Sequence, residues 1–146
     1  MKPIITTLLL LFTLTAFTQT PIDTSEIFTV VEDMPAFPGC EDLATNDERR
    51  KCTETNLLKF YYKKIGTLPV EDACLYSGLI VVLFVIDTTG HIESIEAKGC
   101  GKITEEIVKV VEQMNKMEKP WKPGKQNGQK VRVRYILSIR KRHNPN

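Results

Sequence analysis

The sequence is poor in the residues on which most enzymes and metal sites depend. It has two histidines, of which only His91 lies in the predicted folded domain, so a zinc site is not expected. No serine or cysteine nucleophile motif accompanies His91, which we interpret as a surface turn residue rather than a general base. The segment Gly99–Lys102 lacks the length and the closing Ser or Thr of a phosphate-binding loop. We therefore expect no enzyme activity, no metal and no cofactor.

A strong excess of one charge sign is also lacking. The formal net charge is +2, although residues 116–146 carry ten Lys or Arg against one acid. Residues 20–115 oppose this with seventeen acids against nine Lys or Arg. No aromatic interleaving and no recognised nucleic-acid module accompanies the basic end. We expect the two parts to neutralise each other in the folded domain, and we expect no nucleic-acid partner.

Apolar runs long enough to cross a membrane are absent as well. The apolar stretch Ile4–Phe17 is shorter than the roughly 20 residues that a membrane span needs, and threonines interrupt it. A lysine precedes this stretch, and small residues flank the position before Gln19, as at a cleavage site. The pattern predicts a signal peptide over residues 1–19, cleaved near Thr18/Gln19, and a periplasmic protein. An uncleaved membrane anchor is the alternative; a lipoprotein-type anchor is excluded because no cysteine precedes Cys40.

The four cysteines follow neither CxxC nor zinc-knuckle spacing. In an oxidising compartment an even number of cysteines indicates disulfide bonds, and four cysteines allow three pairings. We favour Cys40–Cys52, which closes a short loop onto the start of the first predicted helix. We pair Cys74 with Cys100 because the predicted hairpin brings Gly78 opposite Cys100.

Three segments have the patterns of β-strands. Apolar residues occupy alternate positions from Val131 to Ile139, which predicts a strand with one buried face and one cationic, wet face. Leu79–Ile86 is apolar at every position, as in central strands that are buried on both faces. A turn at Asp87–Gly90 joins it to the more polar segment His91–Lys98, which we place nearer an edge.

Two helices are predicted. Thr45 and Glu48 have the spacing of a capping box, and a helix over Asn46–Ile65 follows. We expect its apolar residues to be buried on one face: Leu57, Leu58, Tyr61 and Ile65. We expect its basic residues to be wet, that is, exposed to solvent: Arg49, Arg50, Lys51, Lys63 and Lys64. Apolar residues at helical spacing predict a second helix over residues 103–118, which ends before Pro120.

The element order predicts an α+β fold. We expect a small two-layer domain with two helices and a three-stranded antiparallel-type sheet of order 2-1-3, in which the outer edge of the last strand is unpaired. Residues 46–142 form this domain. Residues 20–45 form a leader and covering segment, whose apolar residues cover part of the core: Val30, Val31, Met34 and Phe37.

The region around Trp121 resembles a known family. Trp121-x-Pro123 followed by Gly128-x-x-Val131-x-Val133 is similar to the C-terminal domain of TonB-type energy transducers. Glycine and apolar positions upstream match as well: Gly78, Val82, Phe84, Val85, Gly90, Ile92, Ile95, Ile107, Val110 and Val111. The resemblance covers about half of the chain, from Pro69 to Ile139. The segment Ile27–Leu43 resembles an upstream extension found in a subset of the family.

The resemblance implies a periplasmic, TonB C-terminal-like binding module. Its last strand would pair with a short peptide, the TonB box, of an outer-membrane transporter, in support of TonB-dependent transport. We expect a standalone secreted form without the inner-membrane helix and the proline-rich spacer of full transducers. We expect the Trp121 side chain to plug the core, that is, to fill space in it, rather than to bind a peptide.

Partner binding is expected along the outer edge of the last strand, by addition of a peptide strand. The residues are Val131, Arg132, Val133, Arg134, Tyr135, Ile136 and Leu137. Arg132 and Arg134 would favour acidic residues in or beside the peptide. The alternative is a structural protein that forms a homodimer through the same edge.

Overall fold

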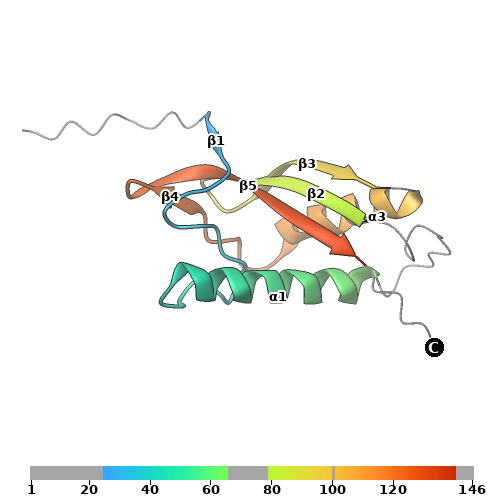
Figure 1. The fold of residues 1–146 in the computed structure, drawn as a ribbon, viewed down its shortest axis with the longest axis horizontal. Helices are drawn as coiled ribbons and strands as arrows, with labels where there is room; N and C mark the ends of the chain where they lie inside the picture. The colour runs from blue at the N-terminus through green and yellow to red at the C-terminus, as the bar shows by residue number, and fades with distance from the viewer. Residues whose placement is uncertain (1–24, 66–78, 100, 141–146) are drawn as a thin grey trace, which may run out of the picture.

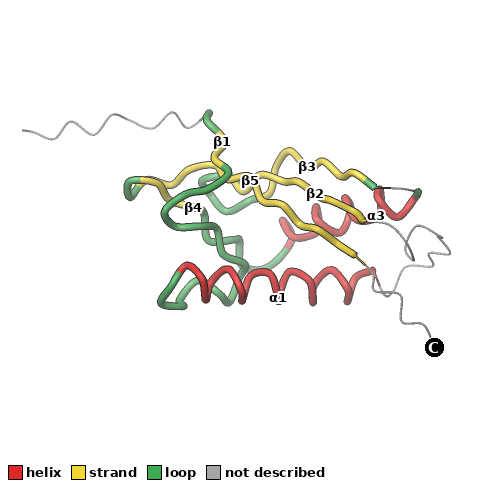
Figure 2. The backbone as a smooth tube through the Cα atoms, viewed as in Figure 1, coloured by secondary structure: helices red, strands yellow, loops and turns green. Residues whose placement is uncertain are grey.

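The computed structural model describes residues 25–65, 79–99 and 101–140. Along the chain they form β1 (Ile27–Phe28), α1 (Asn46–Ile65), β2 (Leu79–Ile86), β3 (Ile92–Lys98), α3 (Lys102–Glu112), the 3-10 helix η1 (Gln113–Lys116), β4 (Gly124–Gln126) and β5 (Gln129–Arg140). The fold is α+β, with the sheet in one layer and the helices in the other (Figures 1 and 2). None of these helices is long and apolar enough to cross a membrane.

The described strands form one five-stranded sheet. β2 lies in the middle, antiparallel to β3 on one side and to β5 on the other, so the predicted order of these three strands is confirmed. The predicted antiparallel-type pairing holds for these three strands, but the prediction of only three strands is wrong, because β1 pairs in parallel with β5 and β4 pairs with β5 in a hairpin. The dipeptide Asn127-Gly128 is the hairpin turn, so the residues before it form a strand rather than a loop.

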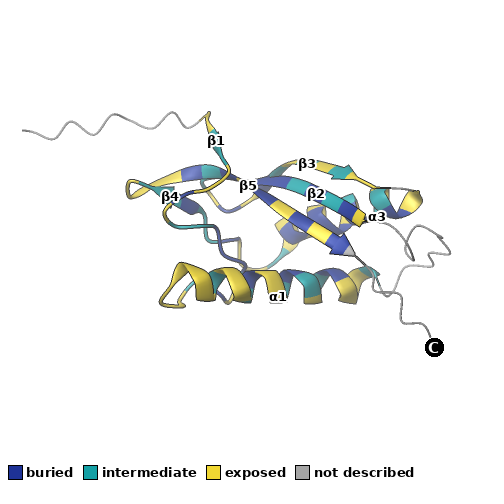
Figure 3. Cartoon of the chain, viewed as in Figure 1, coloured by how far each residue is buried: buried dark blue, intermediate teal, exposed yellow. Residues whose placement is uncertain are grey.

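One face of the sheet holds the core. The buried side chains of β2 and β5 align across the two strands and face the helices: Ile80, Val82, Phe84, Tyr135, Leu137 and Ile139. Residues of α1 and α3 cover them: Leu57, Tyr61, Ile103, Ile107, Val110 and Val111. On the opposite face Leu79 is 48% exposed, and Val81 and Leu83 are half-buried (Figure 3). The prediction that β2 is buried on both faces is therefore wrong from Leu79 to Leu83 and holds only at Val85, which is 2% exposed.

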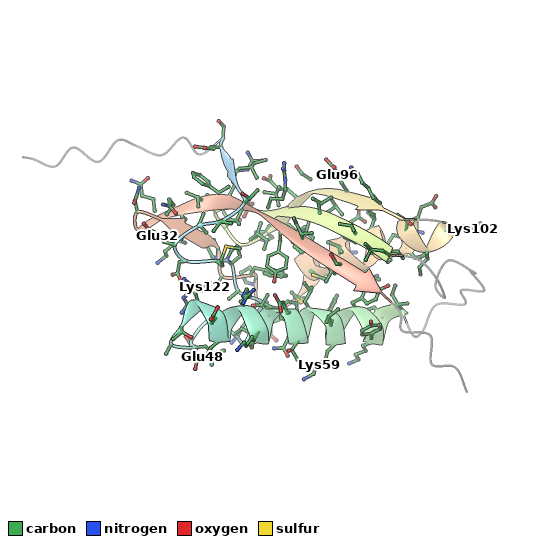
Figure 4. All side chains as sticks on the ribbon, viewed as in Figure 1. Glu32, Glu48, Lys59, Glu96, Lys102 and Lys122 are labelled. Atoms are coloured by element: carbon green, nitrogen blue, oxygen red, sulfur yellow. A yellow bond between two sulfur atoms is a disulfide. The ribbon has the colours of Figure 1, made fainter. Side chains whose placement is uncertain are left out.

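The two layers are also visible in their polar side chains. Lys59 of α1 points away from the sheet, and Glu96 of β3 lies on the side of the sheet opposite α1 (Figure 4). Helices thus cover one side of the sheet, which leaves the other side to Arg, Glu, Lys and a few apolar residues.

The first helix begins as its sequence predicts. The Thr45 amide donates to Glu48 Oε2 at 3.1 Å, and the Glu48 amide donates to Thr45 Oγ1 at 3.2 Å, which completes the capping box. The prediction that Arg49 is wet is wrong: its side chain is 12% exposed and forms an ion pair with Asp33. The covering segment packs against the start of α1 and encloses this guanidinium.

The second helix ends earlier than predicted. α3 stops at Glu112, and the chain continues as η1 to Lys116, with Met114 buried and Met117 partly buried against the core. Asn115 follows the helix and bonds both backbone groups of Ile92: its side-chain amide donates to the carbonyl at 2.8 Å, and its oxygen accepts from the amide at 2.7 Å. This polar clamp fixes the end of the helical layer to the start of β3.

Trp121 plugs the core, as predicted. It is 2% exposed and contacts three aromatic rings at centroid distances of 5.3 to 5.9 Å: Phe37, Phe84 and Tyr135. Its backbone amide donates to the carbonyl of Gly90 at 3.0 Å. The connection from η1 to β4 is thereby anchored next to the β2–β3 turn.

The covering segment is built into the fold. Asp33 and Ala36 form backbone bridges with Lys125 and Lys122, and Val31 and Phe37 are buried as predicted. Val30 is 78% exposed, so the prediction that it covers the core is wrong. The chain turns at this point, and the turn points Val31 rather than Val30 toward Val131 and Val133.

The predicted disulfide Cys40–Cys52 is present, with a Cα–Cα distance of 5.8 Å. It ties the covering segment to α1 across a sequence separation of 12 residues. The second predicted pair, Cys74–Cys100, lies outside the described residues.

Two glycines with nearly the same backbone φ provide a test of the close packing at Trp121. Gly90 and Gly39 have φ of +89 and +90, but a Cβ on Gly90 would lie 2.0 Å from the Trp121 carbonyl oxygen, whereas a Cβ on Gly39 would meet nothing. We expect Gly90→Ala to lower the free energy of unfolding by about 3 kcal/mol or more, and Gly39→Ala by about 1–2 kcal/mol. Urea unfolding of both variants measures the difference. Equal losses would contradict a tight contact at Gly90.

The disulfide should stabilise the domain mainly by restricting the unfolded chain. Replacing both Cys40 and Cys52 by alanine should lower the free energy of unfolding by about 2–3 kcal/mol, as for a short closed loop. Urea unfolding, monitored by tryptophan fluorescence, measures the free energy of unfolding of this variant and of the unsubstituted protein. Unchanged stability would contradict a restriction of the unfolded chain by this crosslink.

Candidate functional site

The outer edge of β5 is only partly covered. On one edge β2 aligns with β5 from Val133 to Arg140. On the opposite edge β1 aligns only with Arg132 and Val133, and no described residue pairs with that edge from Arg134 onward. Val131 aligns with Gly124 of β4. The prediction of an unpaired edge over Val131–Leu137 is thus wrong at Arg132 and Val133, which pair with β1, while the edge from Arg134 to Leu137 is open within the described part of the chain.

The covering segment explains why the edge opens at Arg134. After Phe28 the chain bends at Thr29 and Val30 and turns under the sheet. Val31 then packs against Val131 and Val133 in a small second apolar cluster. The chain cannot both bury Val31 and continue along the edge, so β1 ends after two residues.

The open edge separates two different surfaces. Tyr135 and Leu137 project into the core, whereas Arg134, Ile136 and Ser138 lie on the exposed face. Ile136 is 56% exposed, which is unusual for a large apolar residue in the middle of a strand. The edge is held rigidly from beneath, because the Tyr135 ring stacks on Phe84 with centroids 5.6 Å apart.

A cavity of about 220 Å³ lies beside this open edge. Its lining comes from four parts of the chain: Thr29 after β1, Met34 and Pro35 of the covering segment, Arg50 and Glu54 of α1, and Arg134, Tyr135 and Ile136 of β5. The cavity therefore occupies the corner between the β5 edge, the first half of α1 and the segment that leaves the edge.

Tyr135 forms part of this corner. Burial raises the pKa of Tyr135 to about 12, with a further rise from the Glu54 carboxylate and an opposing effect of Arg50. The phenol is therefore neutral at physiological pH. Glu54 and Arg50 lie one helical turn apart on α1, within electrostatic reach of the Tyr135 hydroxyl.

Arg132 and Arg134 of β5 have different roles. Arg132 forms an ion pair with Glu93 on β3 and donates to the carbonyl of Ser25 at 2.9 Å. Arg134 is exposed, and no described acid pairs with it. Of the two residues predicted to attract acidic peptides, only Arg134 has a guanidinium available to a partner; Arg132 already fastens β1 and β3.

His91 belongs to a hydrogen-bonded turn. Asp87 Oδ1 accepts from the Thr89 amide, the Thr89 hydroxyl and the His91 amide at 2.6 to 2.9 Å, and Thr89 Oγ1 lies 2.8 Å from His91 Nδ1. Burial raises the pKa of Asp87, but the hydrogen bonds from Thr89 and His91 outweigh it and hold this pKa below its usual value. All three donors to the Asp87 carboxylate come from the turn itself, so the cluster serves to shape the turn.

Metal-ligating side chains do not gather in the described ranges. No group of three or more His, Cys, Asp or Glu residues there could hold a metal ion.

The sequence did not assign five of the residues that line the cavity to a binding site: Thr29, Met34, Pro35, Arg50 and Glu54. The spacing of Arg50 and Glu54 places them on one face of a helix, which was the only available indication that they act together. Nothing in the sequence relates them to β5, because tertiary contacts alone bring the covering segment, α1 and β5 to one corner.

Comparison with protein-family models, curated proteins and solved structures gave no match to this chain.

Proposed function

We propose that this protein is a periplasmic binding module that adds an extended peptide as a further strand to the open edge of β5, beginning at Arg134. The observation that carries the proposal is the edge itself: β5 is twelve residues long, yet β1 covers only two of them on that side. Unpaired strand edges attract another extended chain. The exposed Arg134 and Ile136 do not prevent such pairing.

Backbone hydrogen bonds would supply most of the affinity. Each contributes about 0.5–1.5 kcal/mol net, largely independent of the peptide's side chains. The edge from Arg134 to Ser138 admits only a few such bonds, and ordering the peptide opposes them. We therefore propose a modest affinity, suited to a transient complex.

The TonB resemblance supports a partner class: the TonB-box peptide of an outer-membrane transporter. The residues that carry it, Trp121 and the stretch Gly128–Val133, lie where they fix the position of β5. The Cys40–Cys52 disulfide supports an oxidising compartment such as the periplasm.

Backbone methylation of the peptide provides the sharpest test of strand addition. In a strand, alternate amides point toward the neighbouring strand and the others point away. For a TonB-box peptide that binds, N-methylation should abolish binding at every second position and leave it nearly unchanged at the positions between. Isothermal titration calorimetry of the singly methylated peptides measures this. Losses without a two-residue period would rule out strand addition.

Arg134 should contribute an electrostatic attraction. Arg134→Gln should weaken binding of a peptide with an acidic residue by about two- to fivefold at low salt, as for an exposed ion pair. The effect should fade as salt rises. Arg132→Gln is the matched control, since Arg132 is already paired with Glu93, and it should change peptide affinity less. A larger effect of Arg132→Gln would contradict the assignment of the free cation.

The same edge can pair with a second copy of the chain, and the exposed Ile136 beside it favours this alternative. Sedimentation equilibrium with and without the peptide separates the two uses of the edge. Dimers that the peptide dissociates use the same edge, whereas dimers that persist at saturating peptide use another surface.

A further inference from the structure

The cavity beside β5 is continuous with the backbone edge. Three consecutive strand residues line it: Arg134, Tyr135 and Ile136. Their side chains alternate between the two faces of the sheet, as their burial shows, so three in a row border one cavity only where it reaches the strand's backbone. A strand added at this edge would therefore lie across the mouth of the cavity.

Strand geometry decides which peptide side chain enters. Residues that align on neighbouring strands project to the same face of a sheet. Tyr135 projects toward the helices, so the peptide residue aligned with Tyr135 projects the same way, between β5 and α1. The peptide residues on either side of it project to the exposed face, beside Arg134 and Ile136.

The lining selects a large apolar side chain. Met34, Pro35 and the Tyr135 ring form apolar walls, and Met side chains adapt to ligands of different shape. The volume of about 220 Å³ exceeds the roughly 150 Å³ of an apolar cavity that holds benzene. One phenylalanine-sized or leucine-sized group fits this space.

The rim favours an acid next to that group. Arg50, Arg134 and Glu54 line the cavity. Arg50 is already paired with Asp47 at 3.5 Å, which leaves Arg134 as the lining cation without a described acidic partner. A peptide residue adjacent to the inserted one lies on the exposed face with Arg134, so an acidic side chain there meets a cation that no acid in the described ranges pairs with.

We infer that the cavity is a specificity pocket for the added strand, which accepts a large apolar side chain at the position aligned with Tyr135 and prefers an acidic residue next to it. This inference rests on the proposed function, since the pocket acts on a peptide already paired with β5. It deepens that function by giving the peptide a sequence requirement.

Synthetic peptides of about eight residues provide a test that does not depend on altering the protein. The probe is a fluorescein-labelled threonine-rich peptide with one central phenylalanine followed by glutamate. One partner peptide has alanine in place of phenylalanine, and another has glutamine in place of glutamate. Fluorescence anisotropy with the native chain should show about tenfold or greater weakening for the alanine peptide, from the lost apolar burial, and a smaller, salt-dependent weakening for the glutamine peptide.

A protein variant locates the effect at the cavity. Thr29 is exposed at the cavity rim, so Thr29→Trp should fill the space without disturbing the core. The preference for phenylalanine over alanine should then fall to about twofold or less, since the apolar side chain no longer finds a free cavity. Thr55→Trp is the matched control, because Thr55 is also exposed but lies on α1 outside the lining; it should keep the full preference.

The outcomes separate the two proposals. If the phenylalanine and alanine peptides bind equally, or if Thr29→Trp and Thr55→Trp behave alike, the specificity pocket is wrong while strand addition stands. If neither peptide binds and no TonB-box peptide binds, strand addition is wrong and the pocket falls with it.

Discussion

Trp121 packs against Phe37 of the covering segment, Phe84 of β2 and Tyr135 of β5. These three residues come from parts of the chain that are far apart in sequence, and each has the Trp121 ring as a common neighbour. The backbone amide of Trp121 also bonds to Gly90 at the β2–β3 turn. Because an aromatic side chain of this size buries a large apolar area, this one residue aligns the strand edge, the turn and the covering segment. The candidate site depends on that alignment, since Tyr135 is both a neighbour of Trp121 and a wall of the cavity.

The covering segment determines how much of β5 is accessible. β1 occupies the edge at Arg132 and Val133, and the residues that follow it turn beneath the sheet to bury Val31. Asp33 then holds the segment to α1 through Arg49 and to Lys122, which lies two residues before β4. The segment thus covers one end of the edge and supplies Met34 and Pro35 to the cavity at the other. In the proposed function it limits where a peptide can begin to pair and helps to choose the side chain that it inserts.

The two neighbouring arginines of β5, Arg132 and Arg134, differ in whether their charge is paired within the fold. Arg132 is engaged with Glu93 and with the backbone of Ser25, which stabilises the start of β1 on the edge. Arg134, two residues later and on the same face, has no described acid as partner. Two arginines that are equivalent in the sequence pattern therefore serve different purposes: one holds the fold together, and the other is left to interact with a ligand.

The sequence by itself determined the elements whose stability is local. The capping box at Thr45 and Glu48 set the start of α1, a run of apolar residues set both ends of β2, and alternation set the faces of β5. The proximity of Cys40 to the helix start was also enough to predict its bond to Cys52. The tertiary structure decided the rest, because two-residue and three-residue strands such as β1 and β4 carry too little pattern to reveal their partner. It also decided that Arg49 is enclosed, that Val30 is exposed and that Arg132 is occupied. The cavity is also decided by the tertiary structure. The segments that form its walls become neighbours only when Val31, Phe37 and Trp121 are packed in the folded domain.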